Sequence, residues 1–136
     1  MPKRILIVED DLLNRLLYCT VLERSGFRVD AVDDGALAVG AARRFDPDLI
    51  IMDINLPNVS GLELIETLRA DPAFSGTPIL AVTAYVGKGE EGRIREAGAS
   101  EYMAKPISIQ PLLAAVNRLL IEYDAGGDEP AASRSG

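Results

Sequence analysis

Short apolar runs alternate with amphipathic segments along most of the chain. The apolar runs are rich in β-branched side chains, which is typical of buried strands. Each segment that follows has apolar residues three or four positions apart, which is typical of a helix with one buried face. Five such pairs predict an α/β fold, a doubly wound parallel sheet of five strands with five helices on its two faces. The expected strands are 5–8, 27–32, 49–52, 79–82 and 101–104, and the expected helices are 12–25, 36–44, 61–70, 87–97 and 108–122.

The spacing of apolar residues also predicts which helix faces lie inward. In the fourth helix, Gly89 and Gly92 weaken helix formation and Ile94 is the one large apolar residue, so we expect this helix to be the loosest. Periodicity ends at Asp124, which predicts a folded domain over 1–123 and a disordered tail over 124–136. The expected inward residues are Leu13, Leu16, Leu17, Val21 and Leu22 in the first helix, Leu62, Ile65 and Leu68 in the third, and Ile109, Leu112, Leu113, Val116, Leu119 and Leu120 in the last.

Charge and cysteine content indicate which cellular compartment and which classes of partner the chain suits. The 136 residues include 14 Lys and Arg against 21 Asp and Glu, for a net charge of −7. Such an acidic chain repels phosphate backbones and anionic lipid, so we expect no nucleic-acid partner and no membrane insertion. The single cysteine, Cys19, excludes an intramolecular disulfide and favours the cytoplasm as the location. No apolar run is long enough to span a bilayer.

The chain contains no histidine, which removes several classes of chemistry. A Ser-His-Asp triad, a Cys-His pair and an imidazole-bound zinc ion are all excluded. One cysteine cannot form a thiolate cage. Any bound metal is therefore oxygen-ligated, which indicates Mg²⁺, Mn²⁺ or Ca²⁺.

Four of the expected strands end in complementary polar groups. Because the carboxyl ends of parallel strands share one edge, acids after the first and third strands would meet if the winding reverses between them. Clustered carboxylates need a cation, and Mg²⁺ accepts oxygen ligands while leaving room for phosphate. A lysine and a hydroxyl at the same edge are suitable donors to a phosphoryl group. The groups are Glu9-Asp10 after the first strand, Asp53 after the third, Thr83-Ala84 after the fourth and Lys105-Pro106 after the fifth.

This arrangement would allow Asp53 to act as a nucleophile towards phosphorus, giving an acyl phosphate suited to a reversible switch. Each residue also has a simpler interpretation. Asp10 and Asp11 can cap a helix, Asp53 can begin a turn, Thr83 can be an ordinary strand residue or a cap, and Lys105 can be a solvated charge. Complementary groups at all four strand ends favour a site over four coincidences.

These residues resemble the receiver domain of bacterial response regulators, from about Lys3 to Glu122. A narrower likeness, to single-domain cell-division regulators of that family, rests on 88–90, 93–98 and 105–108. The broader resemblance implies the strand order 2-1-3-4-5. It is carried by the runs Ile5-Leu6-Ile7-Val8-Glu9-Asp10, Asp48-Leu49-Ile50-Ile51-Met52-Asp53, Leu56-Pro57 with Gly61, Val82-Thr83-Ala84 and Lys105-Pro106.

The resemblance further implies a role for each matching residue. Asp53 would be the phosphoacceptor, and Lys105 and the Ala84 N–H would bind the phosphoryl group. Thr83 and Tyr102 would form the conformational switch. The Lys105–Pro106 peptide would be cis, and Gly61 would permit a tight loop. The ligands of Mg²⁺, with Mn²⁺ as an alternative, would be Glu9, Asp10, Asp53 and the backbone carbonyl of Asn55.

The expected function is that of a phosphoacceptor switch in a two-component phosphorelay, not an enzyme beyond assisting its own phosphotransfer and autodephosphorylation. The donor would be a histidine kinase or a histidine phosphotransfer domain in trans. The downstream protein would bind the face made by the fourth helix, fifth strand and fifth helix. A receiver fragment of a larger regulator and a phosphorylation-independent adaptor are the alternatives.

Two other classes fit less well. A haloacid dehalogenase-type phosphatase needs a second Asp two residues after the nucleophile, where this chain has Asn55. A flavodoxin-like FMN carrier needs a phosphate loop after the first strand, where Glu9-Asp10-Asp11 would repel phosphate.

Two residues depart from the common receiver pattern or add to it. Glu9 stands where many receivers have Asp, and its longer side chain favours a role through water. Tyr85 is expected to slow attack of water on the acyl phosphate, with a partner-binding aromatic as the alternative.

Overall fold

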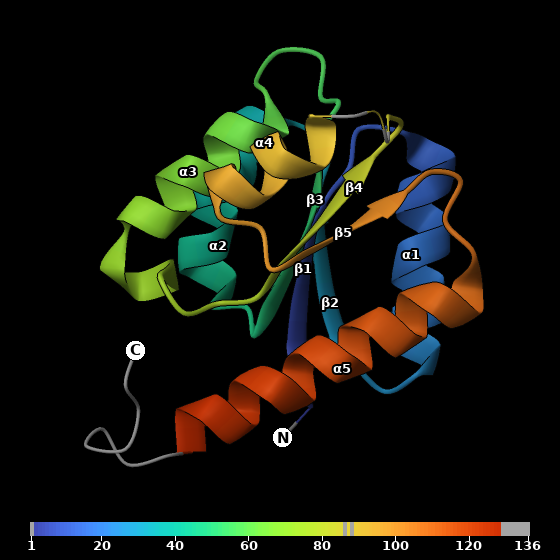
Figure 1. Ribbon diagram of the computed structural model, residues 1–136. Coiled ribbons are helices and arrows are strands. Elements are labelled where there is room, and N and C mark those ends of the chain that lie inside the picture. The colour runs from blue at the N-terminus through green and yellow to red at the C-terminus, as the bar shows by residue number, and fades with distance from the viewer. Residues whose placement is uncertain (1, 86, 88, 129–136) are drawn as a thin grey trace.

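The computed structural model describes residues 2–85, 87 and 89–128, with side chains up to residue 123. Its centre is one parallel sheet in the order β2-β1-β3-β4-β5 (Figure 1). This confirms the predicted fold class and strand order. The strands are β1 (Arg4–Val8), β2 (Arg28–Val32), β3 (Leu49–Asp53), β4 (Ile79–Thr83) and β5 (Glu101–Ala104).

Helices cover both faces of the sheet and create two separate apolar cores. The helices α1 and α5 pack on one face, while α2, α3 and α4 pack on the other (Figure 1). Side chains of β1 alternate between them, since Ile5 and Ile7 join the first core and Leu6 and Val8 the second. The bounds are α1 (Leu12–Arg24), α2 (Ala38–Phe45), α3 (Gly61–Ala70), α4 (Glu90–Ala97) and α5 (Ile109–Asp128), with short 3₁₀ turns at Gly35–Leu37 and Pro72–Phe74.

The strand register aligns the carboxyl ends of the central strands. In β1, β3 and β4 nearly every residue is buried, because helices cover both faces. Val8 pairs with Met52, and Asp53 pairs with Val82. Thr83 in turn pairs with Ala104. The residues that follow these pairs therefore emerge at one edge.

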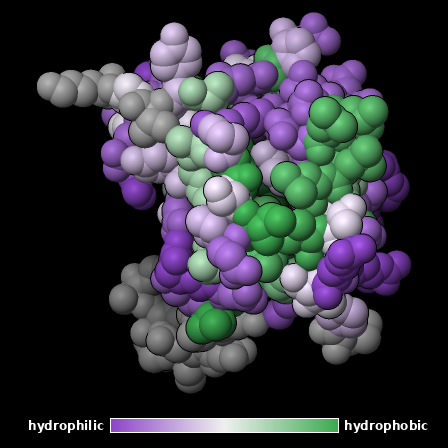
Figure 2. All heavy atoms as spheres, turned by 90° about the vertical axis from the view of Figure 1, so that its right-hand side faces the viewer, coloured by the Kyte–Doolittle hydropathy of each residue, from purple (hydrophilic) through white to green (hydrophobic). Residues whose placement is uncertain are grey.

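The helix α1 turns a different face inward from the one its sequence predicted. Tyr18 and Leu22 are buried against the sheet. Three of the leucines expected in the core are exposed instead, because apolar residues surround the first half of this helix and the large Tyr18 ring takes the inward position. Figure 2 shows apolar side chains gathered on this side of the molecule. We call Leu12, Leu13, Leu16 and Leu17, which are 55%, 76%, 53% and 39% exposed, the α1 leucine patch.

The inward face of α5 agrees better with its sequence. Leu112, Val116, Leu119 and Leu120 are buried as predicted, whereas Ile109 is 44% exposed because it lies at the first residue of the helix. The helix also runs to Asp128, so 124–128 are helical rather than part of a disordered tail. The rest of that expected tail, 129–136, lies outside the described residues. Within the described part of the chain, no helix has the length and hydrophobicity needed to cross a membrane.

The first turn of α4 is held by surface contacts, among them the ion pairs of Glu90 with Arg93 and of Glu91 with Arg95. Its N-cap is Gly89, in the left-handed region with φ 93°, and no side chain caps the helix. Only Ile94 and Ala97 of this helix are buried. At its other end, Gly98 has φ 116°, and a Cβ there would lie 2.6 Å from Cγ of Arg69. That guanidinium donates to the carbonyls of Gly98, Phe74 and Thr77, so the C-terminal end of α4 is fixed more firmly than its start.

Candidate functional site at the carboxyl edge of the sheet

Three carboxylates meet where β1 and β3 end. The two strands are neighbours, with Val8 opposite Met52, so Glu9 and Asp10 emerge beside Asp53. One carboxylate oxygen from each acid lies within 4.8 Å of the others. Glu9 and Asp53 are each 1% exposed, whereas Asp10 is exposed to solvent. The predicted acidic cluster is therefore present, with an open side at Asp10.

Lys105 is the cationic partner of this cluster. Its Nζ lies 3.2 Å from Oδ2 of Asp53 and 3.2 Å from Oε1 of Glu9. Burial raises the pKa of Glu9 to about 7, assisted by the neighbouring Asp53 and opposed by a hydrogen bond from the Asp11 N–H. Burial alone would lower the pKa of Lys105, but the two carboxylates outweigh it and the pKa is raised. One ammonium cannot balance three carboxylates.

One oxygen of the cluster is left without a hydrogen bond. Oε1 of Glu9 is buried and, among the described residues, accepts no hydrogen bond, although the Lys105 ammonium lies near it as an ion pair. A buried carboxylate oxygen without a hydrogen-bond donor is costly unless a cation completes its surroundings. All three acids offer the oxygen ligands that Mg²⁺ prefers. The residues present thus fit a hard divalent cation.

Arg15 orients the loop that carries the acids. From the first turns of α1, its Nη1 donates to the carbonyls of Glu9 at 3.0 Å and Asp10 at 3.3 Å. Asp11, not Asp10, is the N-cap of α1, because its side chain accepts from the N–H of Asn14. Sequence reasoning did not single out Arg15. An arginine one turn into the helix after an acidic pair is the signal that could have identified it.

The opposite rim is formed by the loops after β3 and β4. The Asn55 N–H donates to Oδ1 of Asp53 at 2.9 Å, and Oδ1 of Asn55 accepts from the Ala84 N–H at 2.8 Å. The hydroxyl of Thr83 is fully buried and exchanges hydrogen bonds with the backbone of Tyr85, both at 3.0 Å. All of the predicted phosphoryl-binding and metal-binding positions therefore border one site.

Gly61 allows the loop after β3 to fold tightly against the strand end. Its N–H donates to the carbonyl of Ile54 at 3.1 Å. A Cβ at this position would lie 2.3 Å from the carbonyl oxygen of Asp53 and 2.6 Å from Cα of Ile54. Only a residue without a side chain fits this close approach.

Tyr102 lies on β5 apart from the acids and contacts α4. The guanidinium of Arg95 lies 5.5 Å from the centre of its ring. The carboxylate of Glu91, as its hydrogen-bond acceptor, raises the pKa of Tyr102. The peptide bond between Lys105 and Pro106 is cis.

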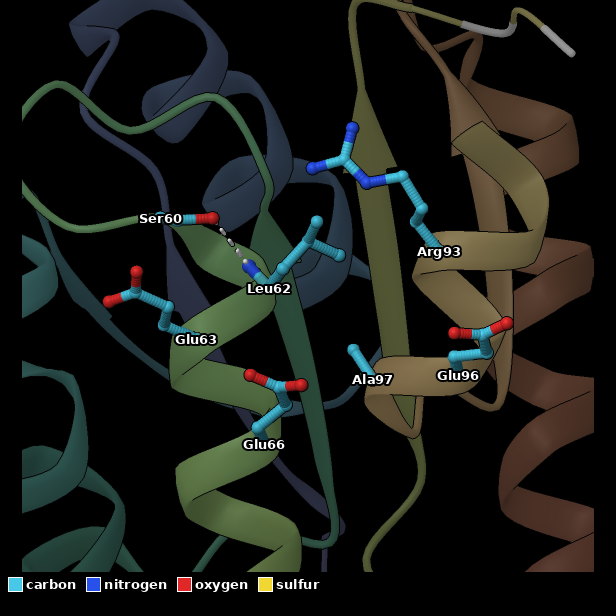
Figure 3. Close-up of a pocket in the computed structure, with 7 residues that line it drawn as sticks. All are labelled: Ser60, Leu62, Glu63, Glu66, Arg93, Glu96 and Ala97. Atoms are coloured by element: carbon cyan, nitrogen blue, oxygen red, sulfur yellow. Dashed lines mark hydrogen bonds between the residues drawn. The ribbon is translucent and has the colours of Figure 1, made fainter. Parts of the chain in front are cut away.

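A hollow of about 300 Å³ also lies between α3 and α4 (Figure 3). Its acidic side chains are exposed, and it holds neither Asp53 nor Lys105. A bond from the Leu62 N–H to Oγ of Ser60 closes its upper edge and caps α3. We therefore take the sheet edge, not this hollow, as the candidate site. The hollow is lined by Ser60, Leu62, Glu63, Glu66, Arg93, Glu96 and Ala97.

Comparison with known proteins gives consistent results. The sequence profile of the response regulator receiver domain matches residues 5–117. The polar-differentiation response regulators DivK of Brucella anthropi and Brucella ovis are each 42% identical over 120 residues, 88% of this chain and 98% of theirs. A CheY-like receiver protein from Methanospirillum hungatei is 28% identical with a TM-score of 0.86, covering 92% of this chain and 98% of its own.

A receiver domain of a sensor histidine kinase from Pseudomonas aeruginosa, solved with a magnesium ion coordinated in its active site cleft, is also similar. It is 33% identical with a TM-score of 0.81, over 88% of this chain and 98% of that one.

Proposed function

The chain belongs to the response regulator receiver domain family, and from this premise we propose that it is a single-domain switch that accepts a phosphoryl group on Asp53. Receiver domains are phosphoacceptor switches rather than classical enzymes. The observation that carries the proposal is the setting of Asp53, a buried carboxylate with Lys105 on one oxygen and two further acids beside it. The folded unit would be residues 1–123, with α5 continuing beyond it to Asp128.

In the proposed step, an oxygen of Asp53 attacks the phosphorus of a phosphohistidine. The P–N bond breaks, its electron pair stays with the imidazole nitrogen, and an acyl phosphate forms on Asp53. Lys105 already lies 3.2 Å from Oδ2 of Asp53 and would follow the negative charge onto the phosphoryl group. Hydrolysis of the acyl phosphate by water would reset the switch.

Glu9, Asp10, Asp53 and the backbone carbonyl of Asn55 would hold Mg²⁺, with Mn²⁺ as a substitute. The bound ion would supply positive charge that offsets the phosphoryl oxygens. Support comes from the charge of the cluster, in which one ammonium faces three carboxylates, and from the carboxylate oxygens within 4.8 Å of one another. The magnesium ion in the similar Pseudomonas aeruginosa receiver agrees with this assignment.

Phosphorylation would be transmitted through Thr83 and Tyr102. The Thr83 hydroxyl and the Ala84 N–H would turn to the phosphoryl oxygens, and the Tyr102 ring would follow inward. Tyr102 contacts Glu91 and Arg95 of α4, so a movement of its ring would alter how α4 packs on β5. A downstream protein would recognise this change on the face formed by α4, β5 and α5.

We propose that the phosphodonor is a histidine kinase or a histidine phosphotransfer domain in trans, since none of these 136 residues is a histidine. We propose that the donor docks on the α1 leucine patch. This patch starts at Leu12, three residues after Glu9, and thus borders the site. Its apolar character suits a stable contact beside an acidic, hydrated cleft.

We further propose a cytoplasmic role in cell-cycle signalling, from the similarity to DivK, without nucleic-acid binding or membrane insertion. A receiver within a larger regulator and a phosphorylation-independent adaptor are the alternatives. Both retain the fold, and the adaptor would show no chemistry at Asp53.

The test is phosphorylation by acetyl phosphate with and without Mg²⁺, read by intact mass on the wild-type protein and on Asp53→Asn. We expect an adduct that requires Mg²⁺ and is absent from the variant. If neither acetyl phosphate nor a panel of histidine kinases produces an adduct, the adaptor alternative replaces the switch.

A further inference from the structure

The side-chain amide of Asn55 bridges the two loops that border the site. Its Oδ1 accepts from the Ala84 N–H at 2.8 Å and lies 3.5 Å from Oγ1 of Thr83. The backbone N–H of the same residue donates to Oδ1 of Asp53 at 2.9 Å. Asn55 therefore contacts both the acceptor carboxylate and the two donors on the β4 side.

These two donors are the ones that the proposed function assigns to the phosphoryl group. On that basis we propose that, before phosphorylation, Oδ1 of Asn55 accepts the hydrogen bond that a phosphoryl oxygen accepts afterwards. We call this the stand-in role of Asn55. In the unphosphorylated protein the amide occupies the Ala84 N–H and holds the loop after β4 in its resting position. When the phosphoryl group arrives, its oxygen replaces the amide oxygen and the side chain is released.

The surroundings of Asn55 permit this exchange. The residue is exposed, so its amide can turn into water and keep its own hydrogen bonds. The incoming phosphoryl oxygen is charged, and charge-assisted hydrogen bonds are roughly twice as strong as those between neutral groups. The Ala84 N–H therefore gains by the exchange, while Asn55 loses little.

The Thr83 hydroxyl strengthens the interpretation. It is fully buried and is held by the Tyr85 backbone, with bonds of 3.0 Å in both directions. Its 3.5 Å separation from Oδ1 of Asn55 is at the limit of a hydrogen bond. The amide thus restrains the loop chiefly through Ala84, and removing that one bond would loosen the loop while the Tyr85 backbone still holds the Thr83 hydroxyl.

Removal of the amide would favour the phosphorylated arrangement before any phosphoryl group binds. One neutral hydrogen bond changes such an equilibrium by about three- to tenfold. Asn55→Ala deletes the amide and keeps the backbone carbonyl that we assign to Mg²⁺. Asn58→Ala is the matched control, since Asn58 is an exposed asparagine in the same loop.

The test uses beryllofluoride, a phosphoryl analogue, titrated at saturating Mg²⁺ into the wild-type protein and both variants. We expect Asn55→Ala to bind beryllofluoride about three- to tenfold more tightly than wild type and Asn58→Ala to match wild type. In the protein without beryllofluoride, exchange of the Ala84 amide hydrogen should be faster in Asn55→Ala. With beryllofluoride, the two proteins should protect this hydrogen equally.

Two results would overturn the inference, and they have different meanings. If wild type binds beryllofluoride but Asn55→Ala binds no more tightly, the stand-in role is wrong and the proposed function stands. If wild type does not bind it at all, the proposed function fails and the inference fails with it. The side-chain NH₂ signals of Asn55 in wild type provide a check without mutation, because they must shift when beryllofluoride is added.

Discussion

The Nζ of Lys105 lies 3.2 Å from Oδ2 of Asp53, so a cation reaches across from the end of β5 to the carboxylate at the end of β3. The same ammonium is an ion-pair partner of Glu9. It occupies the acidic cluster where a metal ion would also act, and the two cations repel one another. We therefore expect Lys105 to oppose metal binding in the resting site while preparing the site for a dianionic acyl phosphate.

Replacing Lys105 with Met should have opposite effects on metal binding and on phosphorylation. We expect Mg²⁺ affinity to rise about three- to tenfold, because a competing charge is removed from the three acids. Phosphorylation by acetyl phosphate should slow by about 100-fold or more, because a donor to the transferring group is lost. Calorimetric titration and intact mass measure the two effects.

Lys105→Arg is the control for charge, and it should leave Mg²⁺ affinity close to that of wild type. Weaker Mg²⁺ binding by Lys105→Met would contradict the competition between the two cations.

Glu9 should make the metal-free protein less stable as pH rises. Its pKa is about 7 when folded and 4.5 as an ordinary side chain, so between these values the folded protein holds a proton that the unfolded chain has released. The stability that Glu9 contributes is therefore fully present below about pH 4.5 and is lost as pH rises through about 7. The loss should be on the order of 3 kcal/mol.

Urea unfolding in EDTA at about pH 5 and about pH 8 measures this effect. The variant Glu9→Gln should lack that part of the pH dependence, since it cannot ionise. Adding Mg²⁺ at the higher pH should restore stability to wild type more than to the variant. Equal pH dependence in the two proteins would show that burial of the Glu9 charge has no such cost.

The fold and the residues of the site were predictable because the strands are continuous apolar runs and the site residues lie at the ends of these runs. Residues 5–8, 49–52 and 79–82 are apolar throughout, which is typical of strands in a parallel sheet covered on both faces. Once the strands are parallel, the residues that end them must share an edge, whatever the exact helix packing. Asp10, Asp53 and Lys105 could thus be placed at one edge from the sequence, while the strand order that makes Asp10 and Asp53 neighbours was supplied by the resemblance to receiver domains.

The inward face of α1 and the hydrogen bonds of Asn55 could not be predicted in this way. Leucines surround the first half of α1, so periodicity does not select one face, and the fit of Tyr18 against the sheet decides it. The bond from the Ala84 N–H to Asn55 joins loops 29 residues apart in sequence. Such a contact depends on the three-dimensional path of both loops, which no local pattern encodes.

Gly61→Ala should damage both the fold and the site. The added Cβ would lie 2.3 Å from the carbonyl oxygen of Asp53, and backbone atoms cannot yield cheaply. We expect a loss of about 3 kcal/mol in the free energy of unfolding, together with slower phosphorylation, because the end of β3 must move. Urea denaturation and intact mass are the measurements.

Gly40→Ala is the matched control, because nothing lies within 4 Å of a Cβ at this exposed position in α2. It should stabilise the protein by up to about 1 kcal/mol. A Gly61→Ala variant as stable as wild type would contradict the close approach described for this loop.

Tyr85→Ala should shorten the life of the phosphorylated state. The Tyr85 side chain is 71% exposed, and its backbone is bonded to the Thr83 hydroxyl at the rim of the site. A bulky ring at this rim hinders the approach of water to the acyl phosphate. We expect dephosphorylation to be several-fold faster, measured by the decay of the adduct mass after the donor is removed. An unchanged decay with weaker partner binding would instead assign Tyr85 to an interface.

Leu13→Arg should separate docking from chemistry. Leu13 is the most exposed member of the α1 leucine patch, at 76%, so an arginine there is tolerated by the fold. Phosphorylation by acetyl phosphate should be unchanged, because the small donor needs no docking surface. Phosphotransfer from a histidine kinase should fall at least tenfold, because a charge would be buried in an apolar contact.

The control for Leu13→Arg is Leu37→Arg. Leu37 is 54% exposed and directly precedes α2, which packs on the opposite face of the sheet. It carries the same change of charge, and it should leave transfer from the kinase intact. If both variants accept the phosphoryl group from the kinase at the wild-type rate, the donor docks elsewhere. If Leu13→Arg is also not phosphorylated by acetyl phosphate, the substitution has disturbed Glu9 and Asp10. The loss of phosphotransfer then comes from damage to the phosphorylation site and not from the docking surface.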